Sequence, residues 1–197
     1  MYGMVNRAIE QFIRKEHGEE VWERVASKAS VSHEFISMEQ YPDSVSVNLV
    51  VGLSEVTGMG PAQVLADVGE YWVSFAYNSE YGDLLDMAGD TLPEVLANLD
   101  EMHTRVGQSF EKLDTPSFWV SDLTEDSMIL HYNSSRDGLA PMVVGLVRGL
   151  GNLLDTDVSV IQVGFKGDTG DHDEFAVAFA KKEKADLGTK PSVTSQT

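Results

Sequence analysis

One histidine and one spaced polar triplet are the residues of this chain best suited to chemistry. His103 lies on the apolar side of a predicted helix, where a neutral imidazole can bind iron. Tyr132, Ser134 and Arg136 follow at alternate positions of a predicted extended segment, which puts three donors on one side. A guanidinium binds a carboxylate through two parallel hydrogen bonds, so the triplet suits the two propionates of a haem. Together the two halves predict a haem pocket.

Each half of this pattern also has a simpler explanation. A single histidine on an apolar helix face is most often a buried imidazole bonded to a carbonyl or a carboxylate. The triplet also fits the polar end of an ordinary strand, although Gly138 after it would let a bound group approach closely. The pattern therefore supports a haem only when both halves are taken together.

The other four histidines predict no second metal site. None has a His-x-x-x-His spacing, and His131 is one residue out of phase with Tyr132 on the predicted strand. His172 lies in an acidic stretch, residues 168–174, which lacks the glycine placement and final glutamate of an EF-hand loop. Without cysteines or paired histidines, a protein-only transition-metal site is poorly supported.

The composition narrows the classes of function. The chain has 197 residues, 42% of them hydrophobic, which is enough for one substantial core. Fourteen Lys and Arg against 32 Asp and Glu give a formal charge of −18, so neither nucleic acid nor a membrane is an expected partner. The chain has no cysteine, which excludes iron–sulfur clusters and covalently attached c-type haem. The N-terminus has no long apolar run, so we expect a cytoplasmic protein.

Apolar periodicity predicts an α+β fold. Helices are expected over residues 5–17, 19–29, 45–57, 61–75, 83–89, 91–106 and 138–154. The helix that carries His103 begins at a capping-box pattern, Thr91 to Glu94. Strands are expected over residues 118–123, 128–134, 158–165 and 175–179. An N-terminal helical subdomain is therefore followed by an antiparallel four-stranded sheet with helices.

The chain is expected to form a single domain over residues 1–182. Its helical part covers about residues 1–60 and its α+β part about residues 61–182. Residues 183–197 are rich in Lys, Ser and Thr, a composition that buries too little apolar area to order itself. We therefore expect a flexible tail there.

Several motifs together resemble one known family, the haem-nitric oxide/oxygen binding (H-NOX) domain, which also forms the sensor region of soluble guanylate cyclase. The resemblance extends from Met1 to about Ala180 and looks closest to stand-alone cyanobacterial members. It rests on His103, the Tyr132-x-Ser134-x-Arg136 triplet, Gly138-Leu139-Ala140-Pro141-Met142, the opening Met1-Tyr2-Gly3, and Gly69-Glu70-Tyr71-Trp72-Val73.

The resemblance implies a noncovalent b-type haem buried between the helical subdomain and the α+β part. His103 would be the proximal iron ligand, and Tyr132, Ser134 and Arg136 would hold the propionates. Pro116 matches the proline that presses on the porphyrin in this family. A turn before a strand would explain Pro116 equally well.

The resemblance also bears on which gas is bound. Oxygen-binding members place a distal tyrosine on the helix after the triplet, but this chain has no tyrosine after Tyr132. Met142 takes the corresponding position, which predicts an apolar distal pocket lined by Met142, Val143, Leu146 and Val5. The indole N–H of Trp72 is a possible donor, and core packing explains that residue as well. We expect nitric oxide and carbon monoxide to bind and oxygen to be excluded.

A non-enzymatic sensor is the function that this resemblance implies. Nitric oxide would release His103 and free its helix, and the resulting subdomain motion would be detected by a separate protein such as a histidine kinase or a cyclase. One alternative makes Met142 a sixth ligand opposite His103, as in electron-transfer haem proteins. A peroxidase is disfavoured because no distal His or Arg can be placed beside Met142 to act as an acid or base. The simplest option is a domain whose cavity holds a lipid or an apolar metabolite.

Overall fold

The structure is a computed structural model that describes residues 1–31, 34–108, 113–168 and 170–182. Its helices are α1 (Gly3–His17), α2 (Glu19–Ala29), α3 (Asp43–Thr57), α4 (Pro61–Tyr77), α5 (Gly82–Asp86), α6 (Leu92–Ala97), α7 (Leu99–Gly107) and α8 (Ala140–Leu153). Its strands are β1 (Ser117–Ser121), β2 (Ser127–Asn133), β3 (Thr156–Gly164) and β4 (Asp173–Lys181). The expected tail, residues 183–197, lies outside the described residues.

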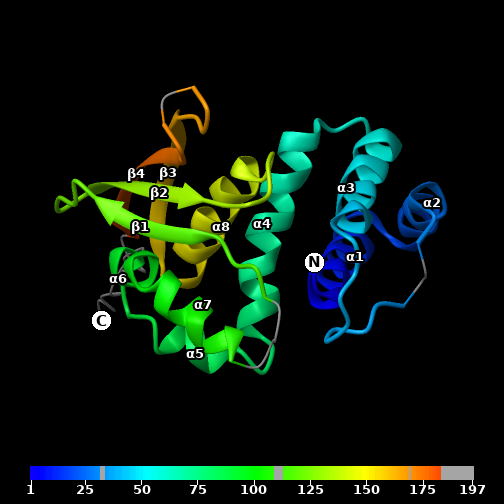
Figure 1. The fold of residues 1–197 in the computed structure, drawn as a ribbon, viewed down its shortest axis with the longest axis horizontal. Helices are drawn as coiled ribbons and strands as arrows, with labels where there is room; N and C mark the ends of the chain where they lie inside the picture. Colours follow the sequence, from blue (N-terminus) through cyan, green and yellow to red (C-terminus); the bar gives the residue numbers. More distant parts are fainter. Residues whose placement is uncertain (32–33, 109–112, 169, 183–197) are drawn as a thin grey trace, which may run out of the picture.

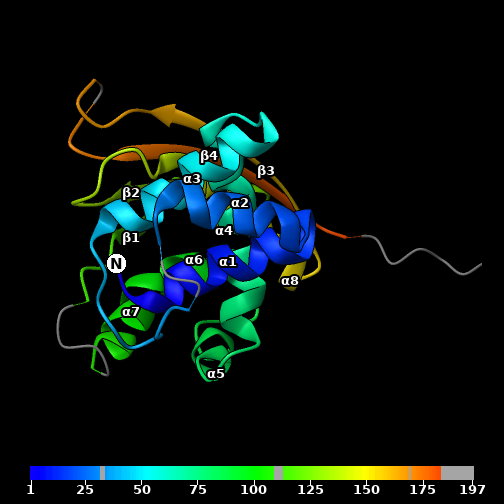
Figure 2. The same cartoon turned by 90° about the vertical axis from the view of Figure 1, so that its right-hand side faces the viewer.

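The first three helices build a core of their own against α4. Trp22 and Leu49 are fully buried there, from α2 and α3, and Val64 and Val68 complete the cluster from the first half of α4. The break between α1 and α2 falls at Gly18, whose φ of 89° favours glycine. Figure 2 shows α1, α2 and α3 in front of the sheet when the molecule is seen from their side.

The four strands form one antiparallel sheet in the order β1-β2-β4-β3. Met128, Leu130 and Tyr132 alternate along β2 and point into a second core cluster, which α6 and α8 cover. Because α8 connects β2 to β3, the helix lies between the two strand pairs in the chain. The predicted α+β class with a four-stranded antiparallel sheet is confirmed.

Helix α4 joins the two clusters, because its first half packs in one and Val73 in the other (Figure 1). Its contact with α8 is made through glycines. A Cβ on Gly69 would collide with the carbonyl oxygen of Met142, and one on Gly145 would collide with that of Ala66. The two backbones therefore touch directly, which positions the cavity-facing side chains of α8.

Two of the differences from the predicted element boundaries have an identifiable cause in the structure. The helix expected over 91–106 starts as predicted, with Glu94 accepting a hydrogen bond from the Thr91 amide at 3.1 Å, but it breaks at Asn98. The Asn98 side chain donates to the Ala88 carbonyl at 2.8 Å, which turns the chain between α6 and α7. Likewise α8 begins at Ala140 and not at Gly138, because Gly138 has a φ of 79°.

Within the described ranges no single helix is long and apolar enough to span a membrane. Only α3 and α4 taken together reach that length and hydropathy, and their axes are bent by 116° at the break.

Candidate functional site

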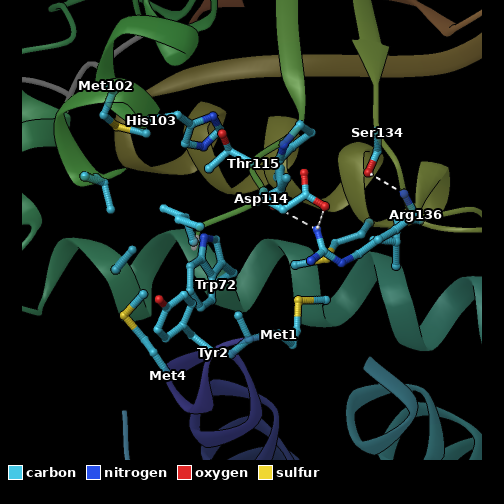
Figure 3. A pocket seen from close by; sticks show the side chains of 18 of the residues that line it. Met1, Tyr2, Met4, Trp72, Met102, His103, Asp114, Thr115, Ser134 and Arg136 are labelled. Atoms are coloured by element: carbon cyan, nitrogen blue, oxygen red, sulfur yellow. Dashed lines mark hydrogen bonds and ion pairs between the residues drawn. The ribbon is translucent and has the colours of Figure 1, made fainter. Parts of the chain in front are cut away.

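A cavity of about 360 Å³ lies between the N-terminal residues, α4, α7, β2 and α8 (Figure 3). Its volume falls in the range of small-molecule and cofactor pockets, roughly 300–1,000 Å³. All of the site residues predicted from the sequence line it, namely Val5, Trp72, His103, Pro116, Tyr132, Ser134, Arg136, Met142, Val143 and Leu146. Their roles toward a haem remain predictions, but the fold brings every one of them to the same cavity.

The imidazole of His103 projects from α7 into this cavity. Its Nδ1 atom is buried and forms no hydrogen bond with any residue that the structure describes. Burial lowers the pKa of His103, while Asp100 and the main chain of Pro116 act in the opposite direction. The ring is therefore held neutral, the form that binds a metal. No carboxylate or carbonyl of the described residues makes a well-formed hydrogen bond to this nitrogen, although the main chain of Pro116 is close enough to act on the ring.

Tyr132 reaches the cavity from the inner face of β2. Burial raises the pKa of Tyr132, with a smaller opposing contribution from its hydrogen bond to Ser134. The phenol is therefore protonated and able to donate at neutral pH. Its ring contacts that of Phe118, with centroids 5.2 Å apart, and Phe118 in turn lies 5.9 Å from the ring of His103.

The rest of the triplet is positioned by a turn and not by strand alternation. Strand β2 ends at Asn133, so the predicted extended segment through Arg136 is wrong. The Arg136 amide donates to the Ser134 hydroxyl at 3.1 Å, which folds the chain back toward the cavity. Gly138 is needed for its positive φ and not for close approach, since a Cβ there would meet nothing within 4 Å.

The Arg136 guanidinium lies in a network of charges at the cavity mouth. Its Nε donates to the Asp43 carboxylate at 2.7 Å, and Nη1 donates to the Asp114 carbonyl at 2.8 Å. Asp43 also accepts the N-terminal amine of Met1, and this hydrogen bond, opposed by burial and helped by Arg136, lowers the pKa of Asp43. Within the described part of the chain, Nη2 has no partner, so the guanidinium retains donors for an anionic group.

Sequence reasoning missed several cavity residues near the N-terminus, above all Tyr2. Figure 3 shows Tyr2 beside Trp72, across the cavity from His103. The chain is fixed there because the Gly3 amide donates to the Glu39 carbonyl at 2.8 Å, and a Cβ on Gly3 would collide with Ile36. Met142, Val143 and Leu146 line the cavity from α8, and Tyr2 adds a hydroxyl to this otherwise apolar lining. The Met1-Tyr2-Gly3 motif was the sequence feature that could have indicated Tyr2 as a cavity residue.

The geometry has a counterpart among known proteins. Residues 2–162 match the model of the haem-NO-binding family. The chain belongs to the H-NOX family. This is a family of haem-based gas sensors, and its members resemble this chain in both sequence and fold.

The sequence relatives of this H-NOX domain include soluble guanylate cyclases. Soluble guanylate cyclase gcy-33 of Caenorhabditis elegans is 30% identical over 171 residues, 85% of this chain and 18% of the relative. Soluble guanylate cyclase gcy-31 of the same organism is 28% identical over 162 residues, 81% of this chain and 23% of the relative. The H-NOX chain therefore spans about a fifth of the length of these relatives.

Solved structures show the same fold. An H-NOX protein from S. oneidensis in the Fe(II)NO ligation state superimposes with a TM-score of 0.82 at 18% identity, covering 92% of this chain and 100% of that one. An unliganded Fe(II) H-NOX protein from K. algicida gives 0.79 at 20% identity, covering 96% and 100%. The resemblance found in the sequence motifs is confirmed, as is the fold that it implies.

Proposed function

We propose that this H-NOX chain is a sensor that binds nitric oxide and carbon monoxide at a ferrous b-type haem and does not retain oxygen. The observation that supports it most strongly is the shared cavity of His103 and the Tyr132, Ser134 and Arg136 triplet. The haem would supply the iron to which the gas binds. The domain itself would carry out no catalysis.

The residues of the cavity fit such a group. A buried imidazole nitrogen without a partner indicates that the protein's own hydrogen bonds do not account for His103, which we propose as the iron ligand. Tyr132, Ser134 and Arg136 would donate to the propionates, and Asp43 would share the Arg136 guanidinium with them. Pro116 lines the same cavity as His103, a position from which it would press on the porphyrin.

Oxygen exclusion follows from what the far wall of the cavity lacks. An iron–oxygen unit is strongly polarised and needs a close hydrogen-bond donor, whereas nitric oxide does not. Met142, Val143 and Leu146 on α8 offer none, and Val5 on α1 is equally apolar. Tyr2 and Trp72 carry polar hydrogens and lie across the cavity from His103, so the selectivity depends on both facing away from the iron.

Signalling would begin with the release of His103. Helix α7 is joined to the sheet because the Asp100 carboxylate, one turn before His103, accepts the Phe118 amide at 2.6 Å. A shift of α7 would therefore be passed to β1, and the helical subdomain would move relative to the α+β part. Since relatives named soluble guanylate cyclases carry a matching region, we propose a cyclase as the effector, with a histidine kinase as the second candidate.

The absorption spectrum of purified, haem-supplied protein tests this function. We expect a coloured protein whose reduced, gas-free spectrum is that of five-coordinate iron, because His103 would be the one protein ligand of the haem iron. A split, low-spin reduced spectrum would favour the alternative with Met142 as sixth ligand and electron transfer as the function. A colourless protein despite ample haem would overturn the haem assignment and favour an apolar metabolite.

A further inference from the structure

Three side chains of metal-ligating types meet on the face of the sheet that is turned away from the cavity. His131 comes from β2, Glu174 from β4, and His172 from the end of the β3–β4 connection, drawn in orange in Figure 1. His131 and Tyr132 are neighbours in the chain and therefore point to opposite faces of the sheet. The group is thus separate from the cavity that Tyr132 lines.

The three potential ligand atoms have the spacing of a metal site. His131 Nδ1 lies 2.9 Å from His172 Nε2 and 3.5 Å from Glu174 Oε1, and His172 Nε2 lies 3.4 Å from the same oxygen. Tetrahedral zinc with bonds of 2.0–2.1 Å separates its ligand atoms by about 3.3 Å. The three atoms therefore form one face of such a tetrahedron with little movement.

The outer nitrogen of each histidine already has a partner. The Nε2 of His131 lies 2.8 Å from the Ser121 hydroxyl, and the Nδ1 of His172 lies 2.7 Å from the Asp171 carboxylate. Metal-bound histidines usually carry such a second hydrogen bond, which fixes the tautomer and the ring orientation. Both rings thus turn their other nitrogen toward Glu174.

The strands also leave room for the carboxylate. Trp119, His131, Glu174 and Gly164 lie opposite one another in a single row across the sheet. A Cβ on Gly164 would come within 2.8 Å of Glu174 Oε2, so any larger residue would displace this side chain. The indole of Trp119 stacks flat on the His131 ring, with centroids 5.0 Å apart and planes inclined by 1°.

We propose that His131, His172 and Glu174 bind one zinc ion, with a water molecule in the fourth position. The charges suit a cation, since Glu174 lies between the two histidines, Asp171 accepts a hydrogen bond from His172, and Asp122 adjoins Ser121, the partner of His131. A bound ion would join β2, the strand that carries Tyr132, to the start of β4. Zinc would thereby stiffen the strand that carries Tyr132.

Zinc content of the full, haem-loaded chain tests this proposal. After dialysis against buffered zinc, we expect one zinc per chain by elemental analysis, counted separately from iron. His172→Ala should abolish stoichiometric binding, and Asp171→Asn should weaken it by about 10-fold to 100-fold through loss of the second hydrogen bond. His17→Ala, which alters a histidine at the end of α1, serves as the matched control and should bind zinc like the wild type.

His172 and Asp171 lie outside the strands of the sheet, so we expect both variants to fold like the wild type. An unchanged haem spectrum checks this, and a loss of zinc can then be assigned to the missing ligand or hydrogen bond. Added zinc should also raise the melting temperature of the wild type but not that of His172→Ala. Absence of zinc from the wild type, or equal zinc in His172→Ala and His17→Ala, would overturn the proposal.

Discussion

The Nε atom of Arg136 donates to the carboxylate of Asp43 at 2.7 Å, which joins the turn after β2 to the first turn of α3. The two residues are 93 positions apart in the chain. Asp43 also accepts the Met1 amine at 2.5 Å, so one carboxylate holds the N-terminus, α3 and the triplet together at the cavity mouth. It connects the two parts of the molecule whose relative motion we propose as the signal.

Asp43→Asn should lower stability slightly at neutral pH. The side chain is 46% exposed, so the loss should be no more than about 1 kcal/mol. Because the folded-state pKa of Asp43 is lowered, its contribution is full well above the ordinary value of 3.8 and is lost as the pH falls through the folded value. Urea unfolding at several pH values should show the wild type and the variant converging in acid. Asp157→Asn, an exposed β3 change, should leave neutral-pH stability unaltered; equal losses for both variants would contradict the argument.

Gly145→Ala should destabilise the contact between α4 and α8. The added Cβ would collide with the main-chain oxygen of Ala66, which cannot rotate away, so we expect a loss of about 1–3 kcal/mol or more. Gly107→Ala is the matched control, because a Cβ there meets nothing within 4 Å. Denaturant midpoints of the two variants measure the difference, and similar midpoints would show that the helices separate easily.

His103→Gly should weaken haem binding by more than the roughly 10-fold to 100-fold expected for loss of an outer-shell partner. The reason is that this imidazole is the proposed bond to iron, and free imidazole should restore binding by entering the space left on α7. Haem titrations with and without imidazole give the affinities. A variant that retains haem fully would indicate a different iron ligand, whereas His17→Gly should have no effect on the titration.

Much of this fold could be predicted from the sequence because its signals are local. Apolar spacing and the Thr91–Glu94 capping box placed the helices, and period-two alternation placed β2. The break at Asn98 was missed because its cause is a hydrogen bond to Ala88, ten residues earlier, which no periodicity shows.

For the site, too, local sequence signals were predictive and contacts between distant residues were not. The lining residues predicted from the motifs do share a cavity, but the three donors arrive by a turn and not by the expected strand. The pairing of His131 with His172 was missed altogether, because the two are 41 residues apart and meet only through sheet register. The glycine contacts between α4 and α8 could not be predicted from the sequence either, because they arise only when the two helices pack together.

Met142→Tyr should give the protein some ability to retain oxygen. The Met142 side chain lines the cavity from α8, so a phenol at this position would add a donor where the wall has none. Trp72→Phe should change nothing if the Trp72 N–H does not reach a bound gas. Oxygen dissociation measured by rapid mixing distinguishes these cases, and an unaltered Met142→Tyr protein would show that this residue does not face the iron.

The most direct test is the response of the reduced, oxygen-free protein to each gas in turn. We predict that nitric oxide and carbon monoxide each produce a distinct and stable spectrum, while oxygen leaves the ferrous spectrum unchanged apart from slow oxidation. A lasting, reversible spectral change with oxygen, or no change with nitric oxide, would contradict the proposed selectivity.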